Sequence, residues 1–216
     1  MIRLPSVPGG FACILADPPW RFNSLWGGRP KMVNGSYPSR AVDAHYDTMT
    51  FEEINALPVG EVAAKNSVLF LWLAWPILPK AMQTIEAWGF TYKTCGFNWT
   101  KTNKNGTPFV GLGYWTRANS EVCLIATRGK PKRIAKNVSQ IVWSGRREHS
   151  RKPDEVHARI EALVPGPRLE LFARETRPGW TSWGNEATKF NSGLDARPIS
   201  CDSILTLKGD DLASLA

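Results

Sequence analysis

The sequence has few of the residues that build disulfide frameworks or zinc sites. Its four cysteines lie far apart without a CxxC pair, and its three histidines show no HxxxH spacing. We therefore expect reduced thiols in a cytoplasmic protein, and no metal site. No apolar run approaches the roughly 20 residues of a membrane helix, and the first residues lack the apolar segment of a signal peptide. These absences exclude a secreted disulfide scaffold and argue against a membrane partner.

Acidic residues are scarce in the middle of the chain. Residues 93–152 hold 13 Lys and Arg but only two acidic residues, a net charge of +11, whereas the remaining residues carry −3, giving +8 in total. Such a basic block favours a phosphate-bearing partner through counterion release, and a solvated surface is the alternative interpretation. The basic side chains that we expect to contact nucleic acid are Arg128, Lys130, Lys132, Arg133, Lys136, Arg146, Arg147 and Arg151.

Short apolar runs alternate with helical patterns along the chain. Strands are predicted at 11–16, 67–72, 90–99, 121–127, 140–143 and 169–173. Helices are predicted from the N-cap Thr50 to about Leu57, from Pro79 to Trp88, and after Pro153, where Val156, Ile160, Leu163 and Val164 follow helical spacing. Strands that are apolar on both faces predict an α/β fold with a mostly parallel central sheet and helices on both faces. The length suits one domain at residues 1–187, followed by a polar, weakly ordered tail at 188–216.

The segment Asp17-Pro18-Pro19-Trp20 follows the first predicted strand. Ligands of such sheets bind at the carboxyl ends of the strands. The prolines lack N–H groups, so their carbonyls are expected to be free of competing hydrogen bonds, while Asp17 supplies a carboxylate and Trp20 a flat stacking surface. Two acceptors beside an aromatic plane match the exocyclic amine of a planar base. A strand-ending turn with a packed tryptophan is the alternative.

The ADPPW segment resembles the catalytic motif of the N6-adenine methyltransferases. Together with stretches at 46–50, 69–72, 98–103, 115–124, 129–131, 149–154, 170–174 and 179–186, it resembles the MT-A family of the messenger-RNA adenosine methyltransferase, which includes bacterial and phage members. The resemblance runs from Phe11 to Glu186. It implies a Rossmann-like methyltransferase fold in permuted order, with the catalytic motif N-terminal and the cofactor elements C-terminal, and S-adenosylmethionine as cofactor.

The resemblance also implies a role for each site residue. Asp17 and Pro18, within the motif that includes Pro19, would hold the target amine, and Trp20 or Tyr46 would flank the base. The residues implied at the cofactor are Lys152, Leu171, Phe172, Arg174, Asn185 and Glu186. Residues 175–177 depart from the eukaryotic pattern, and the upstream acidic residue that grips the cofactor's adenine there has no counterpart here. The loop at 21–45 is longer than in those relatives and is a candidate target clamp.

The expected activity is N6-adenine methylation of DNA by direct methyl transfer. The basic stretch at 93–152 is then expected to hold the nucleic-acid strand beside the edge of the sheet that carries the active site. RNA is the second candidate substrate. A non-catalytic nucleic-acid-binding relative and a small-molecule methyltransferase are the rival classes. The sequence leaves open whether the protein recognises a short motif, has low sequence specificity, or gains specificity by forming a homodimer.

Overall fold

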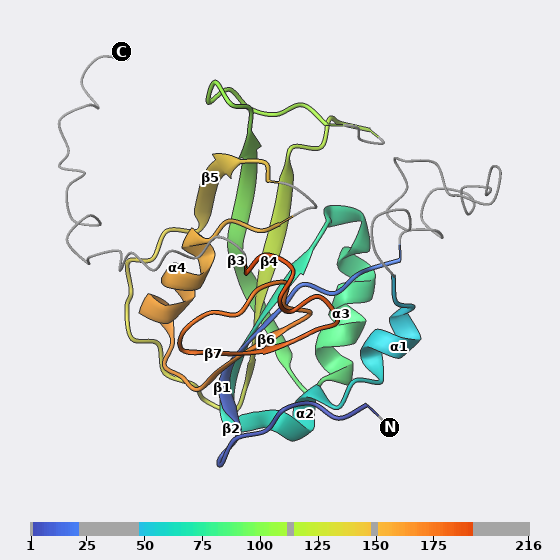
Figure 1. The fold of residues 1–216 in the computed structure, drawn as a ribbon, viewed down its shortest axis with the longest axis vertical. Helices are drawn as coiled ribbons and strands as arrows, with labels where there is room; N and C mark the ends of the chain where they lie inside the picture. The colour runs from blue at the N-terminus through green and yellow to red at the C-terminus, as the bar shows by residue number, and fades with distance from the viewer. Residues whose placement is uncertain (1, 22–47, 112–114, 148–150, 192–216) are drawn as a thin grey trace.

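A seven-stranded sheet with one reversed strand forms the middle of the protein (Figure 1). The computed structural model describes residues 2–21, 48–111, 115–147 and 151–191. Across the sheet the strands follow the order β5-β3-β4-β2-β1-β6-β7. Their bounds are β1 Phe11–Ala16, β2 Ala63–Leu73, β3 Thr91–Thr102, β4 Ser120–Arg128, β5 Ile141–Gly145, β6 Arg168–Leu171 and β7 Trp180–Trp183. Among these strands β4 alone runs antiparallel to its two neighbours, which confirms the predicted mostly parallel α/β sheet.

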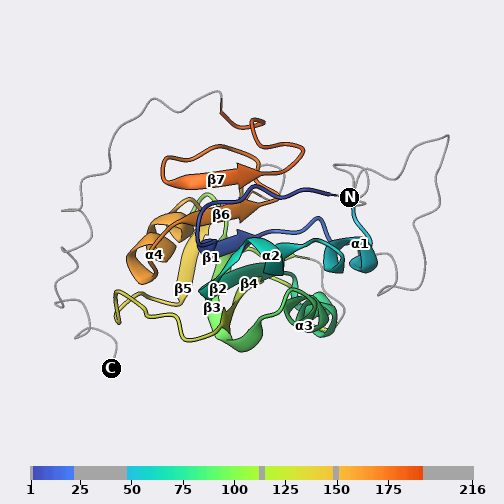
Figure 2. The same cartoon turned by 90° about the horizontal axis from the view of Figure 1, so that it is seen from below.

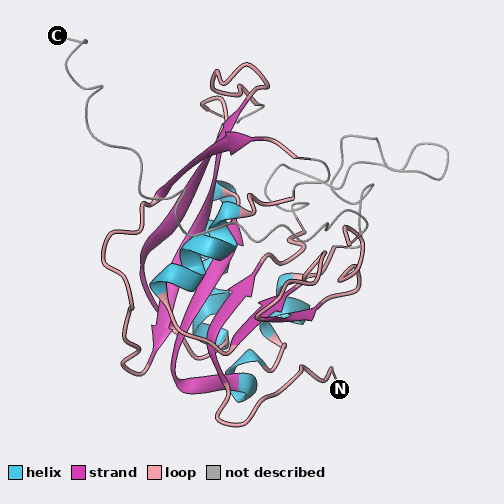
Figure 3. Cartoon of the chain, turned by 60° about the vertical axis from the view of Figure 1, so that its left-hand side comes forward, coloured by secondary structure: helices cyan, strands magenta, loops and turns pink. Residues whose placement is uncertain are grey.

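Helices cover both faces of the sheet, as predicted. They are α1 Phe51–Asn55, α2 Val59–Val62, the 3-10 helix η2 Trp75–Ile77, α3 Leu78–Ala87 and α4 Glu155–Leu163. Figures 2 and 3 show α4 on one side of the sheet and α3 on the other. Alternate residues of β2 enter the two cores: Leu69 and Leu71 face the cluster under α1 and α3, whereas Phe70 and Trp72 face the cluster under α4. Burial of both faces explains the continuous apolar run of this strand.

Local sequence signals set the helix ends close to their predicted positions. Thr50 caps α1, accepting from the Glu53 amide at 3.1 Å while the Glu53 carboxylate accepts from the Thr50 amide at 2.8 Å. The helix α3 stops at Gly89, whose φ of 79° few other residues adopt. Val164, predicted inside α4, instead follows the helix in an extended conformation, and still packs in the same core.

The sequence patterns missed one strand. The run at 169–173 was expected to be the last strand, but β7 at Trp180–Trp183 pairs in parallel with β6 and extends the sheet. Its four residues are too few for an alternating pattern to be recognised. The strand β6 also ends at Leu171, because Phe172 takes a φ of 61°. Beyond the predicted domain end at 187, the Phe190 amide still donates to the Arg174 carbonyl at 3.1 Å, and residues 192–216 lie outside the described part.

The described cysteines lie in strands of the sheet. Cys13, Cys95 and Cys123 are free thiols in β1, β3 and β4, and burial raises the pKa of all three. Within the described residues, none of the helices combines the length and apolar character needed to cross a bilayer.

Candidate functional site

A cavity of about 210 Å³ opens at the carboxyl edge of the parallel strands. It collects segments that follow β1, β6 and β7 together with the chain before α4. Its lining residues are Asp17, Pro18, Pro19, Met49, Lys152, Phe172, Ala173, Arg174, Trp183, Gly184, Asn185 and Glu186. Most of the residues proposed for the amine site and for the cofactor site therefore line one cavity, at the edge where such sheets bind ligands.

The Asp17–Trp20 turn differs from its prediction in two respects. The Pro18 carbonyl already accepts a hydrogen bond from the Trp20 amide at 2.8 Å, so only its second lone pair is available to a ligand. Trp20 lies in the core with 4% of its surface exposed, donates from Nε1 to the Trp72 carbonyl at 3.0 Å, and is absent from the cavity lining. Trp20 anchors the turn here and offers no exposed stacking surface. Tyr46 and most of the 21–45 loop lie outside the described residues.

Lys152 links Asp17 to a second carboxylate that the sequence interpretation gave no role. Its Nζ lies 2.7 and 2.9 Å from the two Asp17 oxygens and 3.3 Å from Oε2 of Glu121, which also binds Lys101. Burial raises the pKa of the Glu121 carboxyl, but Lys152 and Lys101 outweigh burial and hold the pKa below its usual value. Glu121 lies at the start of the reversed strand β4. This strand begins at the carboxyl edge of the parallel strands, where the cavity opens; we call this edge the active edge. The sequence feature that could have indicated a role for Glu121 is that an acidic residue begins an otherwise apolar predicted strand.

We expect Glu121→Gln to lower the free energy of unfolding by about 1–3 kcal/mol at pH 7, because two ammonium groups lose a buried charged partner. The pKa of Glu121 is depressed in the folded protein, so its contribution is present at neutral pH and is lost as the pH falls below about 4. Urea titrations at pH 7 and at pH 3 measure both effects. The control Glu86→Gln removes the same charge from an exposed position of α3. Equal stability of the two variants at pH 7 contradicts this assignment.

On the opposite side of the cavity, the ends of β6 and β7 come very close together. A Cβ atom at Gly184 would lie 2.8 Å from both the backbone N and the O of Ala173, so only glycine fits there without a shift. Nearby, Arg174 Nε pairs with Glu186 Oε2 at 3.2 Å, and the Phe172 ring meets the Trp183 ring edge-on at 5.8 Å. Asn185 is exposed at the rim. Leu171, predicted at the cofactor, is fully buried in the core and is absent from the cavity lining.

The predicted basic surface divides between the two ends of the sheet. Arg128, the last residue of the reversed strand β4, pairs with Ser67 of β2. Ser67 lies about 20 Å along β2 from the active edge. The Lys130 amide binds Asn66, and the Ile134 amide binds the carbonyl at the far end of α4, Leu163. The residues at this amino-terminal end of the sheet are Arg128, Lys130, Lys132, Arg133 and Lys136. The prediction that the whole stretch borders the active edge is wrong, because β4 carries the chain away from it.

The other three basic residues lie toward the active edge, after β5 and before α4. The Arg146 guanidinium stacks 3.7 Å from the Phe109 ring centroid. Arg147 and Arg151 pair with acidic side chains: Arg147 with Asp154 at 2.5 Å, and Arg151 with Glu175 at 2.6 Å. These two guanidinium groups are therefore already engaged within the protein.

Comparison with known proteins agrees with the resemblance found in the sequence. The MT-A70 family model matches residues 11–186. The Type II methyltransferase M.MunI of Mycoplasma sp is 31% identical over 190 residues, which cover 82% of this chain and 77% of that protein. A putative N(6)-adenosine-methyltransferase MT-A70-like of Medicago truncatula is 32% identical over 199 residues, and the catalytic subunit METTL3 of Homo sapiens is 28% identical over 187 residues. The matched segment spans 29% of each of these two longer proteins.

Proposed function

The chain belongs to the MT-A70 family of S-adenosylmethionine-dependent N6-adenine methyltransferases, and we propose that it methylates the exocyclic amine of adenine in DNA. One observation carries the proposal: Asp17 of the ADPPW motif and the Arg174–Glu186 pair line the same cavity. DNA is favoured over RNA because the match spans 77% of a bacterial Type II methyltransferase but less than a third of the adenosine methyltransferases.

The residues on the Arg174 side of the cavity suit S-adenosylmethionine. A guanidinium matches the cofactor's carboxylate, and the side chains of Asn185 and Glu186 match ribose hydroxyls. The close approach of Gly184 to Ala173 leaves backbone, rather than a side chain, at the wall of the cavity. When bound, the cofactor would supply a methyl group on a positively charged sulfur; its transfer to the amine nitrogen would leave a neutral thioether, and the amine would release one proton to solvent.

Asp17 and Lys152 prepare the amine site. Lys152 donates to both Asp17 oxygens and so orients the carboxylate at the place where an amine must bind. An adenine amine donates one N–H to Asp17 and the other to the second lone pair of the Pro18 carbonyl, which orients the nitrogen lone pair away from both acceptors. Glu121 is a second acceptor for Lys152 when the amine takes over an Asp17 oxygen. Orientation and fixed acceptors account for the rate enhancement in this scheme.

Methylation of matched oligonucleotides tests the proposal. The full chain is incubated with S-adenosylmethionine and with single- and double-stranded DNA and RNA of one sequence, and N6-methylated nucleosides are measured by mass spectrometry. We expect the DNA product to exceed the RNA product by at least about tenfold, equal to about 1.4 kcal/mol. Oligonucleotides without adenine are the control.

Three other outcomes would replace the proposal. A larger RNA product identifies an RNA N6-adenosine methyltransferase. Binding of nucleic acid without any transfer identifies a non-catalytic relative. Methylation of a small molecule that persists at high salt and ignores competing polynucleotides identifies a small-molecule methyltransferase, because phosphate contacts weaken as salt rises.

A further inference from the structure

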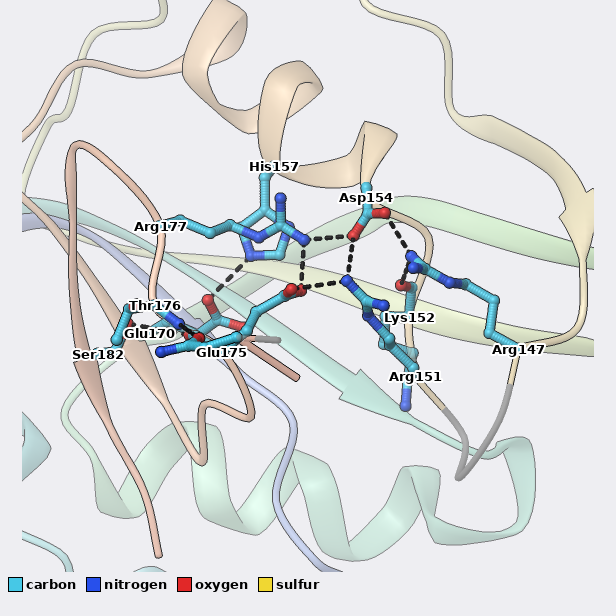
Figure 4. Close-up of polar contacts among 11 residues, drawn as sticks. Arg147, Arg151, Lys152, Asp154, His157, Glu170, Glu175, Thr176, Arg177 and Ser182 are labelled. Carbon is cyan, nitrogen blue, oxygen red and sulfur yellow. Dashed lines mark hydrogen bonds and ion pairs between the residues drawn. The ribbon is translucent and has the colours of Figure 1, made fainter. Parts of the chain in front are cut away.

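A closed ring of ion pairs joins the segment before α4 to the segment after β6 (Figure 4). Arg177 Nη2 donates to both Asp154 Oδ1 and Glu175 Oε1. Arg151 Nη2 lies 2.6 Å from Glu175 Oε2 and 3.5 Å from Asp154 Oδ1, which closes the ring. Arg147 adds a third guanidinium at Asp154 Oδ2. Two carboxylates therefore hold three guanidinium groups drawn from two parts of the chain.

The ring is largely shielded from water except at Asp154, whose side chain is 46% exposed. The side chains of Glu175, Arg151 and Arg177 are only 8%, 17% and 18% exposed. Burial raises the pKa of the Asp154 carboxyl, but Arg177, Arg147 and Arg151 outweigh burial and hold the pKa below its usual value. Burial lowers the pKa of Arg177, whereas Glu175 and Asp154 raise it above its ordinary value. A network of several charges whose Glu175, Arg151 and Arg177 side chains are largely buried holds its geometry better than an isolated exposed ion pair does.

The ring joins the immediate neighbours of two site residues. Arg151 precedes Lys152 of the amine site, and Glu175 follows Arg174 of the cofactor site. A second link runs in parallel: the Phe190 amide donates to the Arg174 carbonyl at 3.1 Å, and the Arg151 guanidinium lies 5.2 Å from the Phe190 ring centroid. The ring thus holds Lys152 of the amine site through its neighbour Arg151, and Arg174 of the cofactor site through its neighbour Glu175.

The sheet fixes the ring in turn. Ser182 of β7 donates to the Glu175 carbonyl at 3.3 Å. Next to the ring, buried His157 of α4 contacts Glu170 of β6 at 2.9 Å, which ties α4 to β6. The ring therefore rests on regular structure, which is what a device that sets side-chain geometry requires.

We propose that Glu175 and Arg177 are positioning residues, which set Lys152 against Asp17 and Arg174 against the cofactor in a single geometry. The inference rests on the proposed function, since it concerns the two halves of that site. Misplacement of reacting groups by about 1 Å can cost on the order of 100-fold in rate. Opening the ring is therefore expected to weaken cofactor binding and to slow methyl transfer together.

The variant Glu175→Gln tests this inference against the control Glu155→Gln. Glu155 forms an exposed pair with Arg159 on α4 at 2.7 Å, so both variants remove one carboxylate charge from an ion pair. Calorimetry with S-adenosylhomocysteine gives Kd, and single-turnover methylation at saturating cofactor gives the transfer rate. We expect Glu175→Gln to raise Kd and to lower the rate by at least about tenfold each, and Glu155→Gln to change both by less than about twofold.

Hydrogen exchange of the cofactor-free protein gives an independent readout. In Glu175→Gln, the amides of 151–157 and of 173–177 are expected to lose protection together, because the ring holds both segments. In Glu155→Gln, protection at 173–177 stays unchanged. If only the 173–177 segment loosens in Glu175→Gln, the two halves are not coupled and the inference is overturned.

Arg177→Lys keeps the inference testable if Glu175→Gln does not fold. Lysine preserves the charge but lacks the planar fork that binds two carboxylates, so we expect smaller losses in the same two measurements. Its control is Arg159→Lys on α4. Wild-type Kd and rate in folded Arg177→Lys or Glu175→Gln would refute positioning while leaving the proposed function intact. A wild-type protein that neither binds S-adenosylhomocysteine nor methylates adenine refutes the proposed function itself, and the positioning role with it.

Discussion

Asp17→Ala is expected to lower the rate of methyl transfer by at least about 10³-fold while leaving the protein folded and able to bind cofactor. Asp17 is half-buried at the end of β1 and contacts the ligand cavity and Lys152, and it has no hydrogen bond to the core of the sheet among the contacts described. Its removal takes away the charged acceptor for the target amine. Single-turnover methylation at saturating cofactor measures the loss.

Two further measurements separate this loss from a general defect. The Kd of S-adenosylhomocysteine is expected to stay within about threefold of wild type, a change below 1 kcal/mol. Asp17→Asn keeps one oxygen acceptor and loses the charge, so its rate is expected to lie between those of Asp17→Ala and the wild type. If the Asp17→Ala variant retains a tenth or more of the wild-type rate, Asp17 is not the acceptor for the target amine.

Gly184→Ala is expected to weaken cofactor binding by about 100-fold, equal to about 2.7 kcal/mol. The added methyl group would lie 2.8 Å from the backbone of Ala173, and backbone atoms cannot move aside as the end of a flexible side chain can. The ends of β6 and β7 must separate, which breaks the bond from the Ala173 amide to the Trp183 carbonyl, now 3.0 Å long. Calorimetry with S-adenosylhomocysteine measures the affinity.

A second glycine supplies the matched control. A Cβ atom at Gly145, at the end of β5, would meet nothing closer than Thr102 Oγ1 at 4.0 Å. Gly145→Ala is therefore expected to leave both Kd and the free energy of unfolding near wild type, with less than about 0.5 kcal/mol of change in stability. Gly184→Ala is expected to destabilise the protein by about 1–3 kcal/mol through overpacking. Equal cofactor affinity in the two variants would show that the Gly184–Ala173 approach does not shape the cofactor site.

Elements whose pattern lies within a few neighbouring residues could be predicted from the sequence. The strand β1 matches its predicted bounds, because a six-residue apolar run ends at two prolines that cannot continue the ladder. The helix α1 begins where Thr50 and Glu53 form a capping box. The strand β7 was missed, since four residues after a glycine turn carry too little periodicity to separate a strand from a loop.

The side chains that complete the site could be predicted only where a motif identified them. Asp17 and Arg174 follow strands at the expected edge and do line the cavity. Glu121 was missed because its place depends on β4 running antiparallel, which no local pattern encodes. The same reversal explains why Arg128, predicted beside the active edge, lies at the opposite end of the sheet. Trp20 was predicted as a stacking surface, yet the packing of β2 and α1 around it places it in the core.

By itself, the sequence determined the α/β class, the family, and the two segments that line the cavity, because each depends on motifs of residues close together in the chain. Only the tertiary structure decided which charges meet. Lys152 reaches Asp17 across 135 positions, and Arg151 reaches Glu175 across 24. Such pairs depend on strand order and direction, which arise from burial of both sheet faces at once. The geometry that brings the proposed amine site and the proposed cofactor site together is therefore a property of the folded sheet.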